Sequence, residues 1–120
     1  FPEDAPAPAG RLTFEEFWNF ARRHPRPHEF IDGRVYPKAG DRRSHNLVVQ
    51  NIGFAVRALL RGGPCQVYLN TISLRIADDV FCPDVLLVCD PSDDDDLIAR
   101  TACVLVEVLS PSTVRRDRTK

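Results

Sequence analysis

Several features that would point to particular classes of protein are missing from this 120-residue sequence. Basic residues are not in excess, since 16 Lys and Arg stand against 17 Asp and Glu. A net charge of −1 argues against a molecule that is basic over its whole surface. No apolar run approaches the roughly 20 residues that span a bilayer. The composition, 43% hydrophobic and 28% charged, is instead that of one globular domain.

The first ten residues lack the basic region and the apolar core of a secretory signal peptide. They carry proline and acidic residues without periodicity, so we expect residues 1–10 to form a flexible tail and residues 11–120 to form a single domain. Because the initial methionine is missing, we expect the sequence to start inside a longer encoded chain. We expect no membrane association and a cytoplasmic location.

The four cysteines lack the C-x-x-C spacing of a zinc site and have no histidine partners at such spacing. We therefore expect buried free thiols, as is usual in the cytosol. The run of four aspartates at positions 93–96 lacks the alternating oxygen ligands and the glycine of a calcium loop. A solvated, polar loop is expected there.

Two local patterns predict the N-terminal elements. Thr13 and Glu16 have the spacing of a capping box, which predicts a helix that starts after Thr13 and ends before Pro25. The dipeptide Asp32-Gly33 lies between two short apolar runs and predicts a β-hairpin over residues 28–38.

The rest of the chain predicts a long helix followed by strands. A helix capped by Asp41 is expected from residue 42 to about residue 60. Residues 102–109 are apolar except for Glu107, which predicts a strand buried on both faces. The segment between it and the apolar run 85–89 contains no strong amphipathic helix, and a parallel crossover usually needs one. These two strands are therefore predicted to pair in antiparallel fashion.

That pairing defines a candidate site. Asp84 precedes the first strand and Glu107 lies near the end of the second, so both carboxylates belong at the same end of the sheet. Neighbouring strands lie about 4.8 Å apart, and two carboxylates at that separation can share a hard cation. Without the cation they would repel each other and one pKa would rise. The spacing equally allows a structural role, with Asp84 in a turn and Glu107 paired with an arginine.

Longer motifs in the sequence resemble a known family. The blocks FCPDVLLVCD (residues 81–90) and VLVEVLSPST (residues 104–113), followed by Asp117 and Lys120, resemble a large bacterial family of restriction endonuclease-like proteins. That family was formerly catalogued as a domain of unknown function and belongs to the PD-(D/E)XK nuclease superfamily. Residues 28–33 and 44–46 also resemble it, so the resemblance runs from about Leu12 to Lys120.

The resemblance carries expectations for the whole chain. It implies an α/β (α+β) fold of restriction endonuclease type, with a mixed β-sheet flanked by helices, an N-terminal helix and a β-hairpin. It implies metal-dependent hydrolysis of nucleic-acid phosphodiester bonds, with DNA as the expected partner and Mg²⁺ or Mn²⁺ as the cofactor, and it allows a homodimer. Family members usually continue with a tyrosine-bearing helix and further strands, so we expect this sequence to be truncated at its C-terminus.

The resemblance also implies roles for single residues. Asp84 and Glu107 match the catalytic carboxylates, and they would hold the metal together with the backbone carbonyl of Val108. Glu29 matches the N-terminal acidic residue, a further catalytic position that can add to the metal and water shell. The superfamily lysine would stand at position 109, where this sequence has leucine. Lys120 matches the lysine of the following helix, and we predict that it is the catalytic lysine. Lys38 is the other lysine of the chain and leaves a second choice for this role.

Two other predictions concern the surroundings of the site. Arg115, Arg116 and Arg118 follow the second strand and would contact flanking phosphates, because guanidinium groups suit bidentate phosphate contacts. The same arginines could instead be solvated charges. His45 lies in the first turn of the long helix, either as an accessory residue of the site or as a solvated or capping histidine.

Two other classes of function stay open at this point. The first is a catalytically inactive module that binds nucleic acid or supports assembly, which predicts salt-sensitive DNA binding without metal binding. The second is a structural domain in which Glu107 is paired with an arginine. Binding of Mg²⁺ or Mn²⁺ that is lost in Asp84→Ala separates the nuclease from both.

Overall fold

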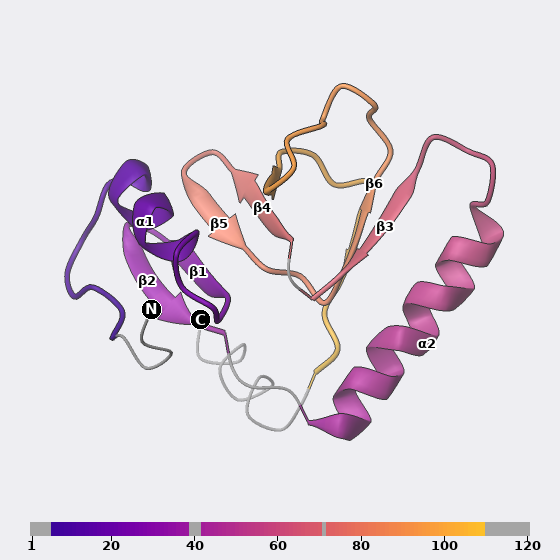
Figure 1. Ribbon diagram of the computed structural model, residues 1–120, viewed down its shortest axis with the longest axis horizontal. Coiled ribbons are helices and arrows are strands. Elements are labelled where there is room, and N and C mark those ends of the chain that lie inside the picture. The colour runs from indigo at the N-terminus through magenta and orange to yellow at the C-terminus, as the bar shows by residue number, and fades with distance from the viewer. Residues whose placement is uncertain (1–5, 39–41, 71, 110–120) are drawn as a thin grey trace.

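The computed structural model describes residues 6–38, 42–70 and 72–109, and Figure 1 shows their arrangement. Within these residues the fold is mixed α+β, with two helices and two β-sheets. The helices are α1 (Phe14–Ala21) and α2 (Arg43–Leu59). The strands are β1 (His28–Ile31), β2 (Arg34–Pro37), β3 (Gln66–Leu69), β4 (Ser73–Ile76), β5 (Asp79–Phe81), β6 (Val85–Val88), β7 (Ile98–Ala99) and β8 (Val104–Val106).

The strands form a five-stranded sheet in the order β2-β1-β5-β4-β7 and a three-stranded sheet in the order β3-β6-β8. The five-stranded sheet is mixed, because β4 pairs with β7 in parallel and its other pairs are antiparallel. The predicted mixed sheet is therefore present, but β6 and β8, the strands next to Asp84 and Glu107, belong to a separate, antiparallel sheet.

The two N-terminal predictions are confirmed. Thr13 caps α1 through both halves of a capping box with Glu16. The hairpin β1–β2 turns at Asp32 (φ 51°) and Gly33 (φ 77°), which is the left-handed backbone that a two-residue hairpin turn requires. Helix α1 packs on this hairpin, and the rings of Phe17 and Phe30 stack 4.7 Å apart.

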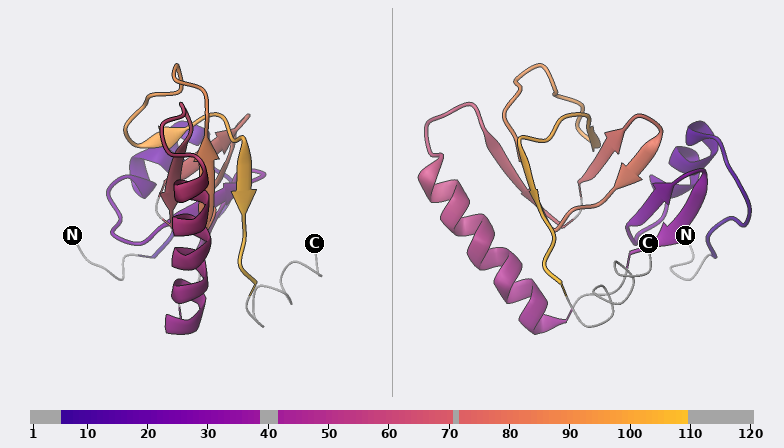
Figure 2. Two further views of the ribbon diagram at one scale, coloured as in Figure 1. Left: turned by 90° about the vertical axis from the view of Figure 1, so that its right-hand side faces the viewer. Right: turned by 180° about the vertical axis from the view of Figure 1, so that it is seen from behind.

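Helix α2 lies along β3, on the opposite side of the molecule from α1 (Figure 2). Gly53 permits this close approach, because a Cβ at that position would lie 2.6 Å from the Leu69 side chain. The helix starts within a residue of the predicted position, with Arg42 as its N-cap. Asp41, the predicted cap, lies outside the described residues.

One hydrophobic cluster joins the two sheets. Leu74 of β4 and Ala99 of β7 pack with Leu86 and Val88 of β6, and all four side chains are buried. Strand β7 was not predicted, because a polar loop was expected after Asp90. The strand has only two residues. Its two residues pair in parallel with β4 beside this cluster.

The prediction of a doubly buried strand over residues 102–109 is wrong. Strand β8 is shorter, and Val104 and Leu105 are 51% and 46% exposed. Among the described residues, β8 has β6 as its one neighbour, so it forms an edge of the three-stranded sheet. The antiparallel pairing of β6 with β8 was predicted and is confirmed.

The cysteines also differ from the prediction. Cys65 and Cys89 form a disulfide between positions that face each other at the ends of β3 and β6. Cys82 is a buried free thiol, as expected, and Cys103 is an exposed one. In the described part of the chain, neither helix is long and apolar enough to cross a membrane.

Candidate functional site

The register of β6 and β8 brings Asp84 and Glu107 together. Val85 pairs with Val106, so Asp84 and Glu107 occupy the next two facing positions of the antiparallel pair. Asp84 lies in the short connection between β5 and β6, where the chain crosses from one sheet to the other. Its residue is only 2% exposed. The prediction that both carboxylates lie at the same end of these strands is confirmed.

Three groups surround the carboxylate of Asp84. The backbone N–H of Val108 donates to Oδ2 over 2.8 Å, and His45 Nε2 lies 3.2 Å from the same oxygen. Lys38 Nζ lies 3.1 Å from Oδ1. Burial alone would raise the pKa of Asp84, but the bonds from Val108 and Lys38 outweigh it and hold the pKa below its ordinary value. Asp84 is therefore ionised at neutral pH.

Glu107 has the opposite tendency. Removal of water around its carboxyl raises the pKa of Glu107 to about 7, and the negative charges of Asp84 and Glu29 add to the rise. The positive charge of Lys38 opposes it. Two neighbouring carboxylates, one ionised and one reluctant to ionise, are the electrostatic signature of a site that a further cation would stabilise.

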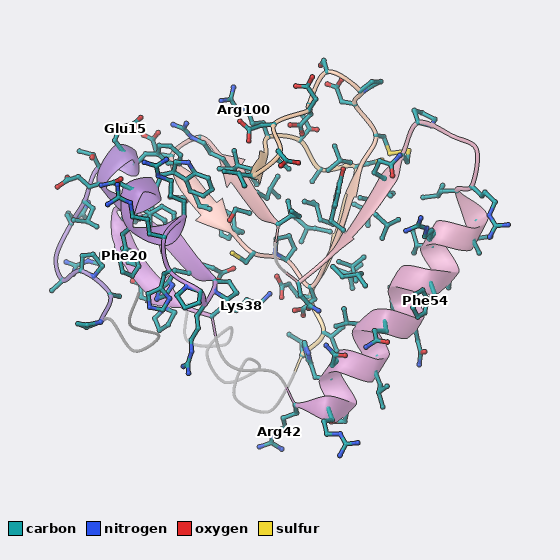
Figure 3. The ribbon with its side chains drawn as sticks, viewed as in Figure 1. Glu15, Phe20, Lys38, Arg42, Phe54 and Arg100 are labelled. Atoms are coloured by element: carbon teal, nitrogen blue, oxygen red, sulfur yellow. A yellow bond between two sulfur atoms is a disulfide. The ribbon has the colours of Figure 1, made fainter. Side chains whose placement is uncertain are left out.

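Lys38, one of the two lysines of the chain, is the residue that the sequence did not place at this site. Figure 3 shows it extending from the end of β2 toward the middle of the molecule. Besides Asp84, its ammonium group donates to the backbone carbonyl of Cys82, and its side chain is 19% exposed. The predicted hairpin could have indicated this position. Its register pairs His28 with Pro37, which puts Lys38 at the same end of the hairpin as Glu29.

Glu29 is buried on β1 and holds the connection that carries Asp84. Its Oε2 accepts the backbone N–H of Cys82 over 2.9 Å, two residues before Asp84. Cys82 Sγ in turn donates to the carbonyl of His28 over 3.4 Å. Burial raises the pKa of the Cys82 thiol to about 11, so this thiol stays protonated.

His45 contacts the site rather than solvent. It projects from the first turn of α2, and Nε2 donates to the carbonyl of Val108 over 2.8 Å. Because a carbonyl only accepts, Nε2 must carry the proton. His45 therefore links α2 to both Asp84 and the backbone of Val108, the predicted metal ligand.

The donor set fits a hard divalent cation with few protein ligands. Within residues 6–38, 42–70 and 72–109, no three His, Cys, Asp or Glu side chains are grouped as ligands of one ion. Two carboxylates and a carbonyl nevertheless suit Mg²⁺, which usually keeps several waters and takes one or two carboxylates together with substrate phosphate. The ion pair of Lys38 with Asp84 shows that this carboxylate can bind a positively charged group.

The remaining predicted site residues lie outside the described residues. These are Lys120, Arg115, Arg116 and Arg118. Their predicted roles stay predictions.

Comparison with known proteins identifies the family of the chain. The model of the Uma2 family, described as "Putative restriction endonuclease", matches residues 14–120. Two uncharacterized proteins of Synechocystis sp., slr1290 and sll1609, are 33% and 24% identical over 115 and 112 residues. These matches cover 93% and 89% of this chain but 60% and 63% of the relatives, so the chain spans less than two thirds of their length.

A solved structure shares the fold. The crystal structure of a putative nuclease of DUF820 from Anabaena variabilis superposes with a TM-score of 0.73 over 88% of this chain and 65% of its own. Its sequence identity is 16%, so the likeness concerns the fold alone. The family match covers most of the sequence, from the start of α1 onward. The chain belongs to the Uma2 family of putative restriction endonucleases.

Proposed function

We propose that this chain is a nuclease that hydrolyses nucleic-acid phosphodiester bonds with Mg²⁺ or Mn²⁺ held by Asp84 and Glu107, with DNA as the expected substrate. The observation that carries the proposal is the facing position of these two carboxylates at the ends of β6 and β8. The rise in the pKa of Glu107 supports it, since a divalent cation would offset the loss of water and the neighbouring negative charges that keep this group protonated.

The divalent cation, when bound, would polarise the scissile phosphate, favour deprotonation of a water and stabilise the charge that develops on the phosphate oxygens. The protein residues have separate tasks. Asp84 and Glu107 supply the negative charge, and the Val108 carbonyl is the predicted third oxygen. Glu29 fixes the backbone before Asp84 through Cys82.

Lys38 and His45 complete this proposal. Lys38 is a cation within contact distance of Asp84, so it would stabilise the phosphate. It could also take the role predicted for Lys120, which is to orient or help deprotonate the attacking water. His45 would fix the position of the Val108 carbonyl relative to Asp84. Comparing Lys38→Gln with Lys120→Gln in the cleavage assay assigns the role to one of the two lysines.

A catalytically inactive nucleic-acid-binding module on the same fold is the second candidate. The ion pair between Lys38 and Asp84 favours it, because the chain already provides a cation for the buried carboxylate. This candidate predicts salt-sensitive nucleic-acid binding without any heat of Mn²⁺ binding.

The proposal is tested by incubating plasmid DNA with the purified chain and Mg²⁺ or Mn²⁺, with EDTA as the metal-free arm. Asp84→Asn and Glu107→Gln are expected to lower cleavage roughly a hundredfold or more, because each removes a charge that the transition state needs. Asp94→Asn is the matched control, since Asp94 is an exposed carboxylate of the polar loop. Circular dichroism must show that all variants are folded.

The outcome separates the candidates. Cleavage by wild type and Asp94→Asn that is lost in the two site variants supports the nuclease. Equal cleavage by Asp84→Asn and wild type contradicts it. Calorimetry that detects no Mn²⁺ binding, together with nucleic-acid binding, supports the inactive module. The homodimer and the cytoplasmic location stay predictions.

A further inference from the structure

A pocket outside this site is lined by several basic residues. The pocket lies where the chain leaves α1 and enters β1, and it encloses about 200 Å³. Trp18, Arg22, His24, Arg26 and Ser73 are among its lining residues. Its volume is below the roughly 300–1,000 Å³ of pockets that enclose a drug-sized ligand. It therefore suits a single charged group with part of its attached molecule.

The rim of the pocket is held in place by hydrogen bonds. The backbone N–H of Arg26 donates to His24 Nδ1 over 3.0 Å, and its carbonyl accepts from His28 Nδ1 over 2.9 Å. The rings of His24 and His28 lie 4.6 Å apart, with their planes nearly perpendicular. Because the backbone of Arg26 is fixed on both sides, a ligand that binds its guanidinium group need not order this loop.

The segment that supplies most of the pocket lining carries charge of one sign. Residues 17–28 contain three arginines and no aspartate or glutamate, in a chain whose net charge is −1. Guanidinium groups bind phosphate with two parallel hydrogen bonds. The indole ring of Trp18 adds an aromatic surface on which a base can stack. Phosphate and base together are the chemistry of a nucleotide unit.

The pocket and the Asp84 site share a neighbour. Ser73 lines the pocket, and its Oγ lies 3.8 Å from the Sγ of Cys82. The carbonyl of Cys82 accepts from Lys38, which contacts Asp84. The pocket and the Asp84 site are therefore linked through Cys82, which is buried.

We propose that this pocket binds a backbone phosphate through Arg22 and Arg26, and the adjoining base against Trp18, from the strand whose phosphodiester bond lies at Asp84 and Glu107. The proposal rests on the proposed function and adds a second region of the protein that the substrate strand would contact.

Trp18 makes the test direct, because it is the single tryptophan of the chain. Single-stranded oligonucleotide is titrated into the metal-free protein, and tryptophan emission is followed at several salt concentrations. Wild type is expected to show a saturable change. Arg22→Gln and Arg26→Gln should each weaken binding about five- to eightfold at ~0.1 M salt, since each lost phosphate contact lowers the salt slope by about 0.7–0.9.

Arg23→Gln is the matched control. Arg23 belongs to the same basic run and is exposed, but it is not among the residues that line the pocket. It should bind within about twofold of wild type, because a general loss of one charge is a small effect at this ionic strength. Equal losses in Arg22→Gln and Arg23→Gln would show diffuse electrostatic attraction and overturn the proposal.

Two further arms complete the design. An emission change caused by inorganic phosphate, with none caused by oligonucleotide, would show a site for small anions and overturn the proposal. Asp84→Asn should lose cleavage but keep the tryptophan response, so failure of one proposal is distinguishable from failure of the other. If wild type cleaves DNA and both arginine variants bind oligonucleotide as tightly as wild type, the pocket proposal is wrong and the proposed nuclease function is unaffected.

Discussion

Lys38 Nζ lies 3.1 Å from Asp84 Oδ1, and this ion pair joins two residues 46 positions apart in the sequence. The side chain of Asp84 is only 3% exposed, so its charge depends on protein groups rather than on water. Lys38 thus serves as the counter-ion of a buried carboxylate in the metal-free protein. A divalent cation at the same carboxylate must share it with Lys38 or displace it.

Replacing Lys38 by alanine is expected to destabilise the metal-free protein by about 1–3 kcal/mol, because a charged hydrogen bond to a buried carboxylate is lost. Mn²⁺ should restore more stability to Lys38→Ala than it adds to wild type, since the ion takes the vacated place. Thermal unfolding with and without Mn²⁺ measures both effects. Arg34→Ala, at an exposed position of the same hairpin, is the control. Equal metal-free stability of Lys38→Ala and wild type would contradict the counter-ion role.

The stability of the metal-free protein should fall as pH rises toward neutrality because of Glu107. Its pKa is about 7 in the folded protein and 4.5 ordinarily, so the folded state holds this proton more tightly than the unfolded chain. The stabilising contribution is therefore complete below about pH 4.5 and is lost as pH rises through about 7.

The comparison of wild type with Glu107→Gln isolates this effect. Burial lowers the pKa of His28, which acts with the opposite sign, because its contribution is lost as pH falls. The low pKa of Asp84 matters only at more acidic pH, since its contribution is present above about 3.8. Urea unfolding between about pH 5 and pH 8 should show a steeper loss in wild type than in Glu107→Gln. Parallel curves would argue against the raised pKa.

His45 should act on the site through position rather than through contact with substrate. His45→Ala removes the donor that links α2 to the Val108 carbonyl and to Asp84. We expect Mn²⁺ binding to weaken about 10- to 100-fold, as for residues that orient metal ligands. His45→Gln places an N–H near the position of Nε2 and should recover part of the affinity. Calorimetry measures the affinities, and equal values for the alanine and glutamine variants would contradict the orienting role.

The facing carboxylates could be predicted because each step depended on local sequence. Apolar runs located the two strands, and the short connection without a helix indicated antiparallel pairing, which fixed Asp84 and Glu107 at the same end. The position of Lys38 depended on a long-range pairing instead. The hairpin joins the larger sheet through Phe30 and Val80, 50 positions apart, and no local pattern announces that contact.

Burial of β8 was predicted wrongly for a related reason. An apolar composition shows that a strand can be buried, but it does not show whether neighbours cover both of its faces. The disulfide was missed for the same reason. Cys65 and Cys89 can be seen to face each other only once β3 is known to pair with β6.

The cysteines give a prediction that tests this pairing. Under non-reducing conditions the native protein should show one thiol that reacts rapidly with a disulfide reagent, at the exposed Cys103. Cys82 should react only after denaturation, because it is buried and its pKa of about 11 leaves almost no thiolate at neutral pH. Reduction before denaturation should release two further thiols, from Cys65 and Cys89.

Cys65→Ser is the informative variant, since it should add Cys89 to the thiols that are free without reductant. Four reactive thiols in denatured, unreduced wild type would show that β3 and β6 are not cross-linked in solution.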